Sequence, residues 1–445
     1  MKNVAKTVPY LLVVTLFSVI LYPKFPLFFL PGITVAVRLE DVVISVTLIV
    51  WLISHAQQLN TFVKDPVFRS IGLFFLVTLV SVFSGAYLTQ TLTLTTGLLH
   101  WGRRLEYIAL FFVAATSIKS KKDFMFVFKA LLVISIYIFL YGVGQKYFNL
   151  PVVTTQNKEY AKGLALFYLP GGHLVSTFAG HYDMASVLIL FSPFLYLMLF
   201  ATKKTLQNIF VLKNEWITRA LLIAIITSGL WLLVQAASRI SIVSYMLVAT
   251  ASLIFIKKYK YIPVVIISIL LFINLSSNLI TRYMSIFNVA VQKVISLEDS
   301  LIAVHAQTEE EPQLVEDRST SIRLNVEWPR ALRALQKNPA LGTGYSSITL
   351  ATDNDYLRAL GETGILGTVS LFLIFGNLVH ALLSSIVNIK RNTIYKIFLL
   401  GAIALMPGVM LNMVFIDILE ASKFAIVFWI LLGVAYSASL KYHEK

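Results

Sequence analysis

The chain has no cysteine among its 445 residues. This absence excludes a disulfide framework and any metal site built from thiolates. Charged residues are also scarce, at 13%, where a soluble domain carries about 25%. Hydrophobic residues reach 58%, and the mean hydropathy is +0.79. This composition excludes an ordinary soluble domain and predicts a polytopic membrane protein.

The apolar runs have the length of membrane helices, about 17 to 25 residues each. Strands of a membrane barrel would be about half as long and would alternate. The first run follows Lys2 and Lys6 as in a signal peptide, but no small-x-small cleavage site precedes Tyr22, so we interpret it as a retained span. We predict about twelve spans, near Val8–Leu21, Ile33–Ile53, Ile71–Tyr87, Leu98–Ser117, Phe124–Gly142, Met184–Phe200, Trp216–Val234, Ile240–Ile256, Ile262–Ile280, Ile365–Ile386, Ile394–Val414 and Phe424–Leu440.

Basic residues mark alternate gaps between these spans and therefore predict their orientation. The positive-inside rule assigns the marked gaps, and both termini, to the cytoplasm. The predicted fold is then all-α, with residues 1–280 forming nine spans and an external segment at about 145–183. Residues 281–357 form a long, partly helical external loop, and residues 358–445 form the last three spans.

Cations also gather on the side that this orientation makes external. Short external loops normally avoid such charges, so with a formal net charge of +15 they predict an anionic partner approached from outside. Attraction to lipid headgroups is the alternative. The residues are Arg103, Arg104, Lys146, Lys158, Lys162, Arg239, Arg282, Arg318, Arg323, Arg330, Arg333 and Arg358.

Two arginines are the leading candidates for binding that anion. Arg239 stands at the start of a predicted span, where a buried charge is costly and functional by default; snorkelling to the interface is the alternative. Arg323 opens an amphipathic helix predicted to lie on the outer surface, with Glu327 and Arg330 on its polar face and Pro329 as a possible kink. A solvated polar face is the alternative for this helix. Two converging guanidinium groups suit a diphosphate, whose oxygens they bind in pairs.

The outer-surface helix is followed by Asn338-Pro339-Ala340-Leu341-Gly342-Thr343-Gly344. Proline ends a helix and the glycines permit tight turning. No strand precedes this run and no Lys-Ser/Thr follows it, so it is neither a phosphate-binding loop nor a dinucleotide fingerprint. We predict a hinge that places the next segment.

Acidic residues precede the next span in the run Asp353-Asn354-Asp355-Tyr356. Either aspartate is a candidate general base if it lies within reach of an acceptor hydroxyl. Helix capping is the alternative for at least one of them. No spacing among these carboxylates demands a metal ion.

The first external segment ends in His181-Tyr182-Asp183, directly before the sixth span. His181 and Asp183 are candidates to line the same cavity as the arginines. Capping by Asp183 and exposure of His181 are equally compatible with the pattern.

Taken in order, these pieces resemble the O-antigen ligase and polymerase superfamily. A Ser-Arg span entry at Arg239 precedes the long loop. The pattern R-x4-W-x2-A…P-x-x-G-x-G follows, and then an acidic-Asn-x-Tyr-Leu-x3-Gly-Glu-x-Gly-x-x-Gly run. The matching residues are Arg323, Trp328, Ala331, Pro339, Gly342, Gly344, Asn354, Tyr356, Leu357, Glu362, Gly364 and Gly367.

The resemblance implies a bacterial inner-membrane glycosyltransferase with a GT-C-like fold and a site facing the periplasm or exterior. Such enzymes move a glycan from undecaprenyl diphosphate to an acceptor hydroxyl, with no metal and no other cofactor. The implied partners are the lipid-linked glycan, a lipid or glycan acceptor and membrane lipids, and no nucleic acid is expected. Arg239, Arg323 and Arg330 would bind the diphosphate, with His181, Asp183, Asn354 and Tyr356 as further substrate-binding candidates. Asp353 and Asp355 would share the catalytic assignment with Arg239 and Arg323.

One position departs from the family pattern. Many members have histidine where this chain has Asp353, which leaves the identity of the base open. A repeat-unit polymerase is an alternative to a ligase. A lipid-linked sugar transporter is an alternative from another class, and it would have polar or helix-breaking residues in the middle of several spans. A structural partner in an envelope assembly is a third alternative.

Overall fold

The computed structural model describes residues 5–22, 26–29, 36–56, 64–152, 166–209, 214–274, 321–349, 351–386 and 393–443. Several sequence predictions fall outside these ranges. They concern Lys158, Lys162, Arg282 and Arg318, and the end of the ninth predicted span, residues 275–280.

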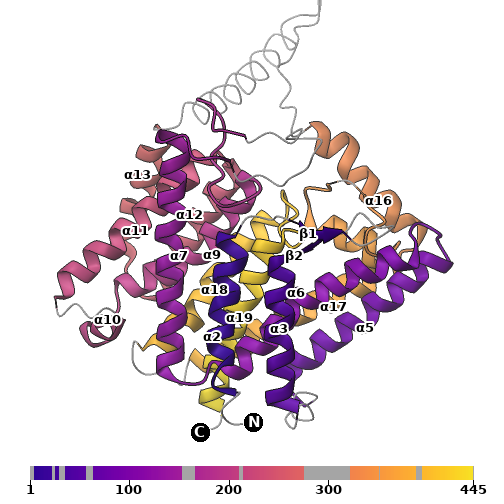
Figure 1. Cartoon of the computed structure of the whole chain (residues 1–445), viewed down its shortest axis with the longest axis horizontal. Helices are drawn as coiled ribbons and strands as arrows, with labels where there is room; N and C mark the ends of the chain where they lie inside the picture. The colour runs from indigo at the N-terminus through magenta and orange to yellow at the C-terminus, as the bar shows by residue number, and fades with distance from the viewer. Residues whose placement is uncertain are drawn as a thin grey trace, which may run out of the picture.

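The described chain is mainly a bundle of helices (Figure 1). A two-stranded antiparallel hairpin, β1 (Pro26–Phe29) with β2 (Ala36–Arg38), precedes the second long helix. The helices are α2 (Val8–Leu21), α3 (Leu39–His55), α5 (Pro66–Tyr87), α6 (Leu94–Ser117), α7 (Lys121–Tyr147), α9 (His181–Leu199), α10 (Lys203–Ile209), α11 (Glu215–Gln235), α12 (Arg239–Phe255), η2 (Tyr259–Tyr261), α13 (Ile262–Ile273), η3 (Arg323–Glu327), α16 (Trp328–Lys337), α17 (Asp355–Ile386), α18 (Ile394–Asn412) and α19 (Ser422–His443).

The chain is an all-α integral membrane protein. Each predicted span overlaps one of the long helices. In the described residues, 7 helices are long and apolar enough to cross a membrane: α5, α7, α9, α11, α17, α18 and α19. The larger number of spans stays a prediction.

The predicted start of the second span is wrong. Residues 36–38, which we placed inside the span, form strand β2, and α3 begins only at Leu39. The backbone N–H of Arg38 donates to the Asp41 carboxylate at 2.9 Å, and Glu40 and Asp41 occupy the first turn. Acidic side chains in a first turn stabilise a helix start at that point, and hydropathy alone does not register this.

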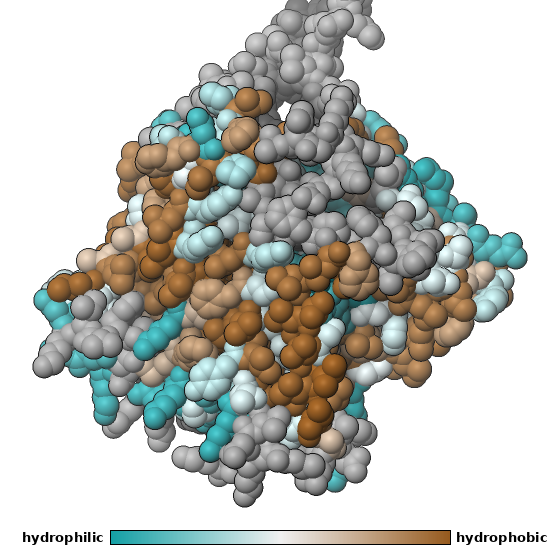
Figure 2. Space-filling model, viewed as in Figure 1, coloured by the Kyte–Doolittle hydropathy of each residue, from teal (hydrophilic) through white to brown (hydrophobic). Residues whose placement is uncertain are grey.

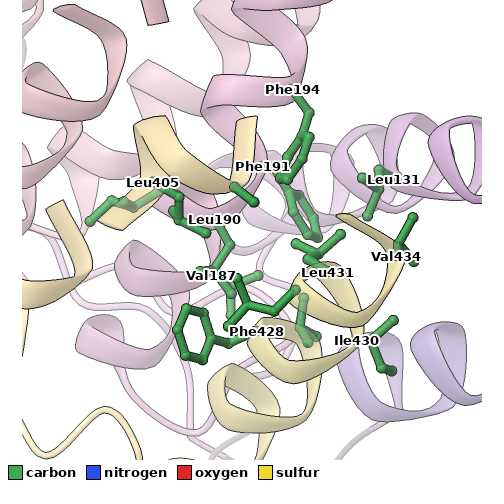
Figure 3. Packing of buried hydrophobic residues seen from close by; sticks show 14 of the residues in the cluster. Leu131, Val187, Leu190, Phe191, Phe194, Leu405, Phe428, Ile430, Leu431 and Val434 are labelled. Atoms are coloured by element: carbon green, nitrogen blue, oxygen red, sulfur yellow. The ribbon is translucent and has the colours of Figure 1, made fainter. Parts of the chain in front are cut away.

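The core lies between α9, α18 and α19. The apolar window of α19 is 94% buried and that of α9 is 83% buried, whereas those of α11 and α17 are 44% buried. Figure 3 shows Phe191 and Phe194 of α9 beside Leu431 of α19, with Leu405 of α18 close by. The central position of α9 and α19 makes them the frame on which the other helices are placed.

The outer faces of the bundle are apolar, as expected for helices in contact with lipid. Figure 2 shows a broad hydrophobic band across the middle of the visible face, with hydrophilic side chains along its lower edge. The two chain ends lie at this lower edge, whereas α16 lies toward the opposite end (Figure 1).

Candidate functional site

Helix α17 is broken at Gly364, near the end at which the polar residues gather. Gly364 has φ 67° and ψ −172°, which is far from helical backbone. The break leaves backbone groups of the flanking turns without helical partners, a costly situation inside a membrane protein.

The run from Asn338 to Gly344 supplies the missing partners. The N–H groups of Thr343 and Gly344 donate to the carbonyls of Gly361 and Glu362, at 3.0 and 2.7 Å. In return, the N–H groups of Ile365 and Leu366 donate to the carbonyls of Pro339 and Ala340, at 2.9 and 3.1 Å. The sequence predicted a hinge here, and the structure instead shows a segment fixed into the break by four hydrogen bonds.

A second set of hydrogen bonds joins the start of α17 to the segment between α18 and α19. The Asp355 carboxylate accepts from the backbone N–H groups of Ile418, at 2.9 Å, and of Leu419, at 3.2 Å. The Asp417 carboxylate accepts from the N–H groups of Thr352, at 2.8 Å, and Asn354, at 2.9 Å. Each segment thus provides an acid for the backbone of the other.

A buried group of ion pairs adjoins these hydrogen bonds through Asp417. Arg358 contacts Asp417 at 2.9 Å, Glu362 at 3.6 Å and Glu420 at 3.7 Å. Arg104 of α6 pairs with Glu420. Burial alone would raise the pKa of Glu420, but the two guanidinium groups hold it below its ordinary value.

These ion pairs border a cavity of about 60 Å³. Its lining contains more carboxylates than guanidinium groups, so it does not suit a diphosphate. The lining residues are Phe74, Arg104, Tyr107, Ile108, Tyr345, Asp355, Arg358, Ala359, Glu362, Thr363, Leu371, Leu419, Glu420 and Trp429.

Arg323 and Asp353 form a separate ion pair nearer the surface. The guanidinium Nε and Nη2 both donate to Asp353 Oδ2, at 3.1 and 2.8 Å. The Asp353 side chain is 30% exposed and that of Arg323 is 14% exposed. A solute can therefore reach the carboxylate, while the guanidinium is largely desolvated.

The electrostatic surroundings of Asp353 favour its use as a base. Burial raises the pKa of Asp353, the charge of Asp417 adds to this rise, and Arg323 opposes it. Burial and the charge of Asp353 likewise raise the pKa of Glu327. A carboxylate with a raised pKa accepts a proton more readily than an ordinary aspartate does.

The polar face of η3 and α16 turns toward the protein. Arg323–Glu327 is a π-helical turn, which shifts the phase of the helix. Leu324 and Leu332 are exposed, at 52% and 45%, whereas Ala331 is buried, so the apolar residues of this helix do not share one buried face. Pro329 follows this π turn closely, inside a helical run that continues from residue 321 to Lys337. Proline removes one helical hydrogen bond, so the irregular turn before it agrees with the kink predicted at this residue.

Three buried polar atoms of this face have no hydrogen-bond partner among the described residues. They are Glu327 Oε2, Trp328 Nε1 and Arg330 Nη1. Buried polar atoms normally have partners, so these three are atoms to which a water, an ion or a ligand could bind. Arg330 adds a second guanidinium to that of Arg323.

The remaining predicted residues lie at the N-terminal ends of α9 and α12. His181 begins α9 and stacks on His173, with ring centroids 4.1 Å apart. His173 Nδ1 lies 3.1 Å from the Ala236 carbonyl, in the turn that leads to Arg239. Asp183 lies in the first turn of α9. His181 is therefore linked through His173 to the turn that precedes Arg239.

The C-terminal end of α18 contacts α9, α12 and α17. Asn412 Oδ1 accepts from Ser244 of α12 at 3.1 Å, and its Nδ2 donates to Ser186 of α9 at 3.4 Å. Two residues before Asn412, the Met410 carbonyl accepts from the Tyr356 hydroxyl at 2.9 Å. Asn354 caps α17 by accepting from the Leu357 N–H at 2.9 Å, which is the capping role considered as its alternative.

Residues 220–372 match the family model described as O-antigen ligase. This part of the chain is similar to the O-antigen ligase family. The matched segment runs from α11 into α17 and includes Arg239, Arg323, Arg330 and Asp353. No curated protein matches the chain.

Sequence reasoning did not assign four charged residues to the site, and three of them, Arg104, Asp417 and Glu420, lie outside residues 220–372. Asp417 and Glu420 were not singled out, and Arg104 and Arg358 were noted only as external cations. All four flank or interrupt predicted spans, where an ionisable residue is by itself a functional signal. That rule, applied to the gap between the last two spans, would have found both acids.

Proposed function

We propose that the chain is a membrane glycosyltransferase that moves a glycan from undecaprenyl diphosphate to an acceptor hydroxyl on the outer side of the plasma membrane. The Arg323–Asp353 pair is the observation that carries this proposal. It combines a cation for the leaving diphosphate with a reachable carboxylate for the acceptor proton. The match to the O-antigen ligase family supports the choice of reaction.

Asp353 is the better of the two candidate bases. The Asp355 side chain is buried, with 5% exposure for the residue, and it accepts from two backbone N–H groups. Those bonds stabilise its ionised form but occupy the lone pairs that a base needs. Asp353 is 30% exposed and keeps a path to an acceptor hydroxyl.

In the proposed reaction, Asp353 is the base and the arginines bind the leaving group. The acceptor oxygen attacks the anomeric carbon of the glycan as Asp353 removes the hydroxyl proton. The bond between that carbon and the diphosphate oxygen breaks, and undecaprenyl diphosphate leaves. Arg323 and Arg330, with Arg239 from α12, stabilise the negative charge that develops on the diphosphate. The chemistry needs no metal ion, since guanidinium groups neutralise the leaving group.

The position of the helix break favours this enzyme over a transporter. Transporter sites lie near the middle of the membrane, in helices broken there. Here the break at Gly364 precedes the apolar part of α17, and the segment from Asn338 to Gly344 closes it. The polar residues therefore gather at the end of the span.

The test is glycan transfer by purified protein in liposomes, with an undecaprenyl-diphosphate-linked glycan and two acceptors. A lipid A core acceptor reports ligation, and a second repeat unit reports polymerisation. Arg323→Ala should lower transfer by about 10²–10³-fold, as expected for removal of one charge-stabilising group. Arg333→Ala is the matched control, because Arg333 lies exposed on the same helix. Full transfer by Arg323→Ala would contradict the proposal.

A further inference from the structure

Asp353 has a backbone conformation that non-glycine residues rarely adopt. Its φ is +49°, in the left-handed region, which costs most L-residues roughly 1–2 kcal/mol and which Asp and Asn adopt more readily than other side chains. Such a conformation persists where the surroundings hold it, and it is often found at functional sites. The contacts that hold residue 353 therefore bear on how its carboxylate is used.

Asp417 binds the backbone on both sides of this residue. Its Oδ2 accepts from the Thr352 N–H at 2.8 Å, and its Oδ1 accepts from the Asn354 N–H at 2.9 Å. Two N–H groups that flank a left-handed residue form a concave anion site, which the Asp417 carboxylate fills. The same two bonds fix the direction in which the Asp353 side chain leaves the turn.

Asp417 is itself held in place. Arg358 Nη1 donates to its Oδ2 at 2.9 Å, and the Asp417 side chain is 11% exposed. The next two residues, Ile418 and Leu419, donate their N–H groups to Asp355. The segment that carries Asp417 is thus fixed from two sides before any substrate binds.

We propose that Asp417 is a positioning residue for Asp353. Its carboxylate holds the turn at 352–354 so that the Asp353 carboxylate faces both Arg323 and the acceptor hydroxyl. This inference rests on the proposed function, because it assumes that Asp353 is the base. It assigns a catalytic contribution to the loop between α18 and α19, which lies outside residues 220–372.

The charge of Asp417 gives the proposal a measurable signature. The charged groups around Asp353 are Arg323, Glu327 and Arg330 from η3 and α16, and Asp417 with its partner Arg358. Among them, Asp417 raises the pKa of Asp353. A base works only when it is deprotonated, so its pKa sets the pH below which transfer is lost.

Asp417→Asn changes position and charge together. Asparagine has one acceptor oxygen in place of two, so the turn loses at least one of its N–H bonds. We expect transfer to fall by roughly 10- to 100-fold, the effect of misplacing a reacting group by about 1 Å. Loss of the negative charge lowers the pKa of Asp353, so the acid limb of the pH–rate profile should move to lower pH. Asp417→Glu keeps the charge, so its acid limb should stay in place while turnover falls.

The experiment measures transfer against pH for the wild type and for Asp417→Asn, Asp417→Glu and Asp353→Asn. A residue that only stabilises the fold would lower the yield of active protein without moving the acid limb. One outcome would contradict the positioning role alone. In it, Asp353→Asn is inactive, while Asp417→Asn has the turnover and the acid limb of the wild type, and the proposed function then stands. If Asp353→Asn keeps full transfer, the base assignment itself fails.

A second measurement covers the case in which Asp417→Asn does not insert. Asp353→Gly and Asp353→Ala both remove the carboxylate, but glycine accepts a left-handed φ and alanine does not. If Asp417 holds the turn, Asp353→Gly should have the higher Tm of the two. Equal Tm values would show that the turn is not held, and would overturn the proposal without any activity assay.

Discussion

Gly342 and Gly364 face each other so closely that neither has room for a side chain. A Cβ atom on Gly342 would lie 2.5 Å from the backbone nitrogen of Gly364, and a Cβ on Gly364 would lie 2.5 Å from the nitrogen of Gly342. Both also have positive φ, 68° and 67°. This contact is what allows the run from Asn338 to Gly344 to close the break in α17.

Alanine at either glycine should therefore open the break. Gly342→Ala and Gly364→Ala place a Cβ against backbone that cannot move aside, and each adds a left-handed penalty of about 1–2 kcal/mol. We expect a marked loss of Tm in detergent and a loss of transfer. Gly376→Ala is the control, because a Cβ there meets nothing within 4 Å. Equal Tm values for the two glycine variants and the control would contradict the packing described here.

Exchanging the base should move the pH dependence in a defined direction. The pKa of Asp353 lies above that of an ordinary aspartate. Many members of the family that the sequence resembles have histidine at this position, and the ordinary pKa of histidine is about 6.5. Histidine also tolerates positive φ better than most residues. Asp353→His should therefore keep measurable transfer, with its acid limb moved to higher pH.

The control for this exchange is Asp353→Asn, which fits the turn and cannot accept the proton as a carboxylate does. Its transfer should fall by about 10²–10⁴-fold, the usual contribution of a general base. A transfer profile for Asp353→His that overlays the wild type would show that residue 353 does not titrate in the reaction.

Hydropathy made the helices of this fold predictable. Lipid requires long apolar helices, so each predicted span overlaps an observed helix. The errors occur where local polar groups decide the backbone. Glu40 and Asp41 start α3 later than the apolar run suggests, and the π turn at Arg323–Glu327 changes which side of the surface helix faces the protein.

The site was only partly predictable, because its connections are tertiary. Arg323 and Asp353 stand in recognisable local patterns, and the structure pairs them. Asp417 stands in a short gap with no motif, and its partners Thr352 and Asn354 are 65 and 63 positions away. No local pattern encodes a contact of that length. The shared placement of Arg239 and Arg323 under one diphosphate stays a prediction.

A buried lysine supports the outer end of the bundle and can be tested without an activity assay. Lys423 is fully buried, and its Nζ donates to the carbonyls of Ile20, Tyr22 and Thr177, at 3.0, 2.9 and 2.8 Å. Lys423→Met keeps the apolar stem but leaves three carbonyls without this donor, and the bonds to two of them, Ile20 and Thr177, are buried. Each unmade bond costs about 1–3 kcal/mol, so Tm should fall clearly, while exposed Lys203→Met should leave it unchanged. Equal Tm values for both variants would show that the carbonyls find other partners.

The absence of cysteine makes the predicted orientation directly measurable. An Arg333→Cys variant has a single thiol on the exposed surface of α16, and a Lys203→Cys variant has one at the start of α10, in a gap that the basic residues assign to the cytoplasm. A membrane-impermeant maleimide should label Cys at 333 in right-side-out vesicles and Cys at 203 in inside-out vesicles. The reverse pattern would place the Arg323–Asp353 pair on the cytoplasmic side, where the proposed acceptor is absent. Labelling of both thiols in the same type of vesicle would place residues 203 and 333 on one side of the membrane. The number of membrane crossings between them would then be even, and not odd as predicted.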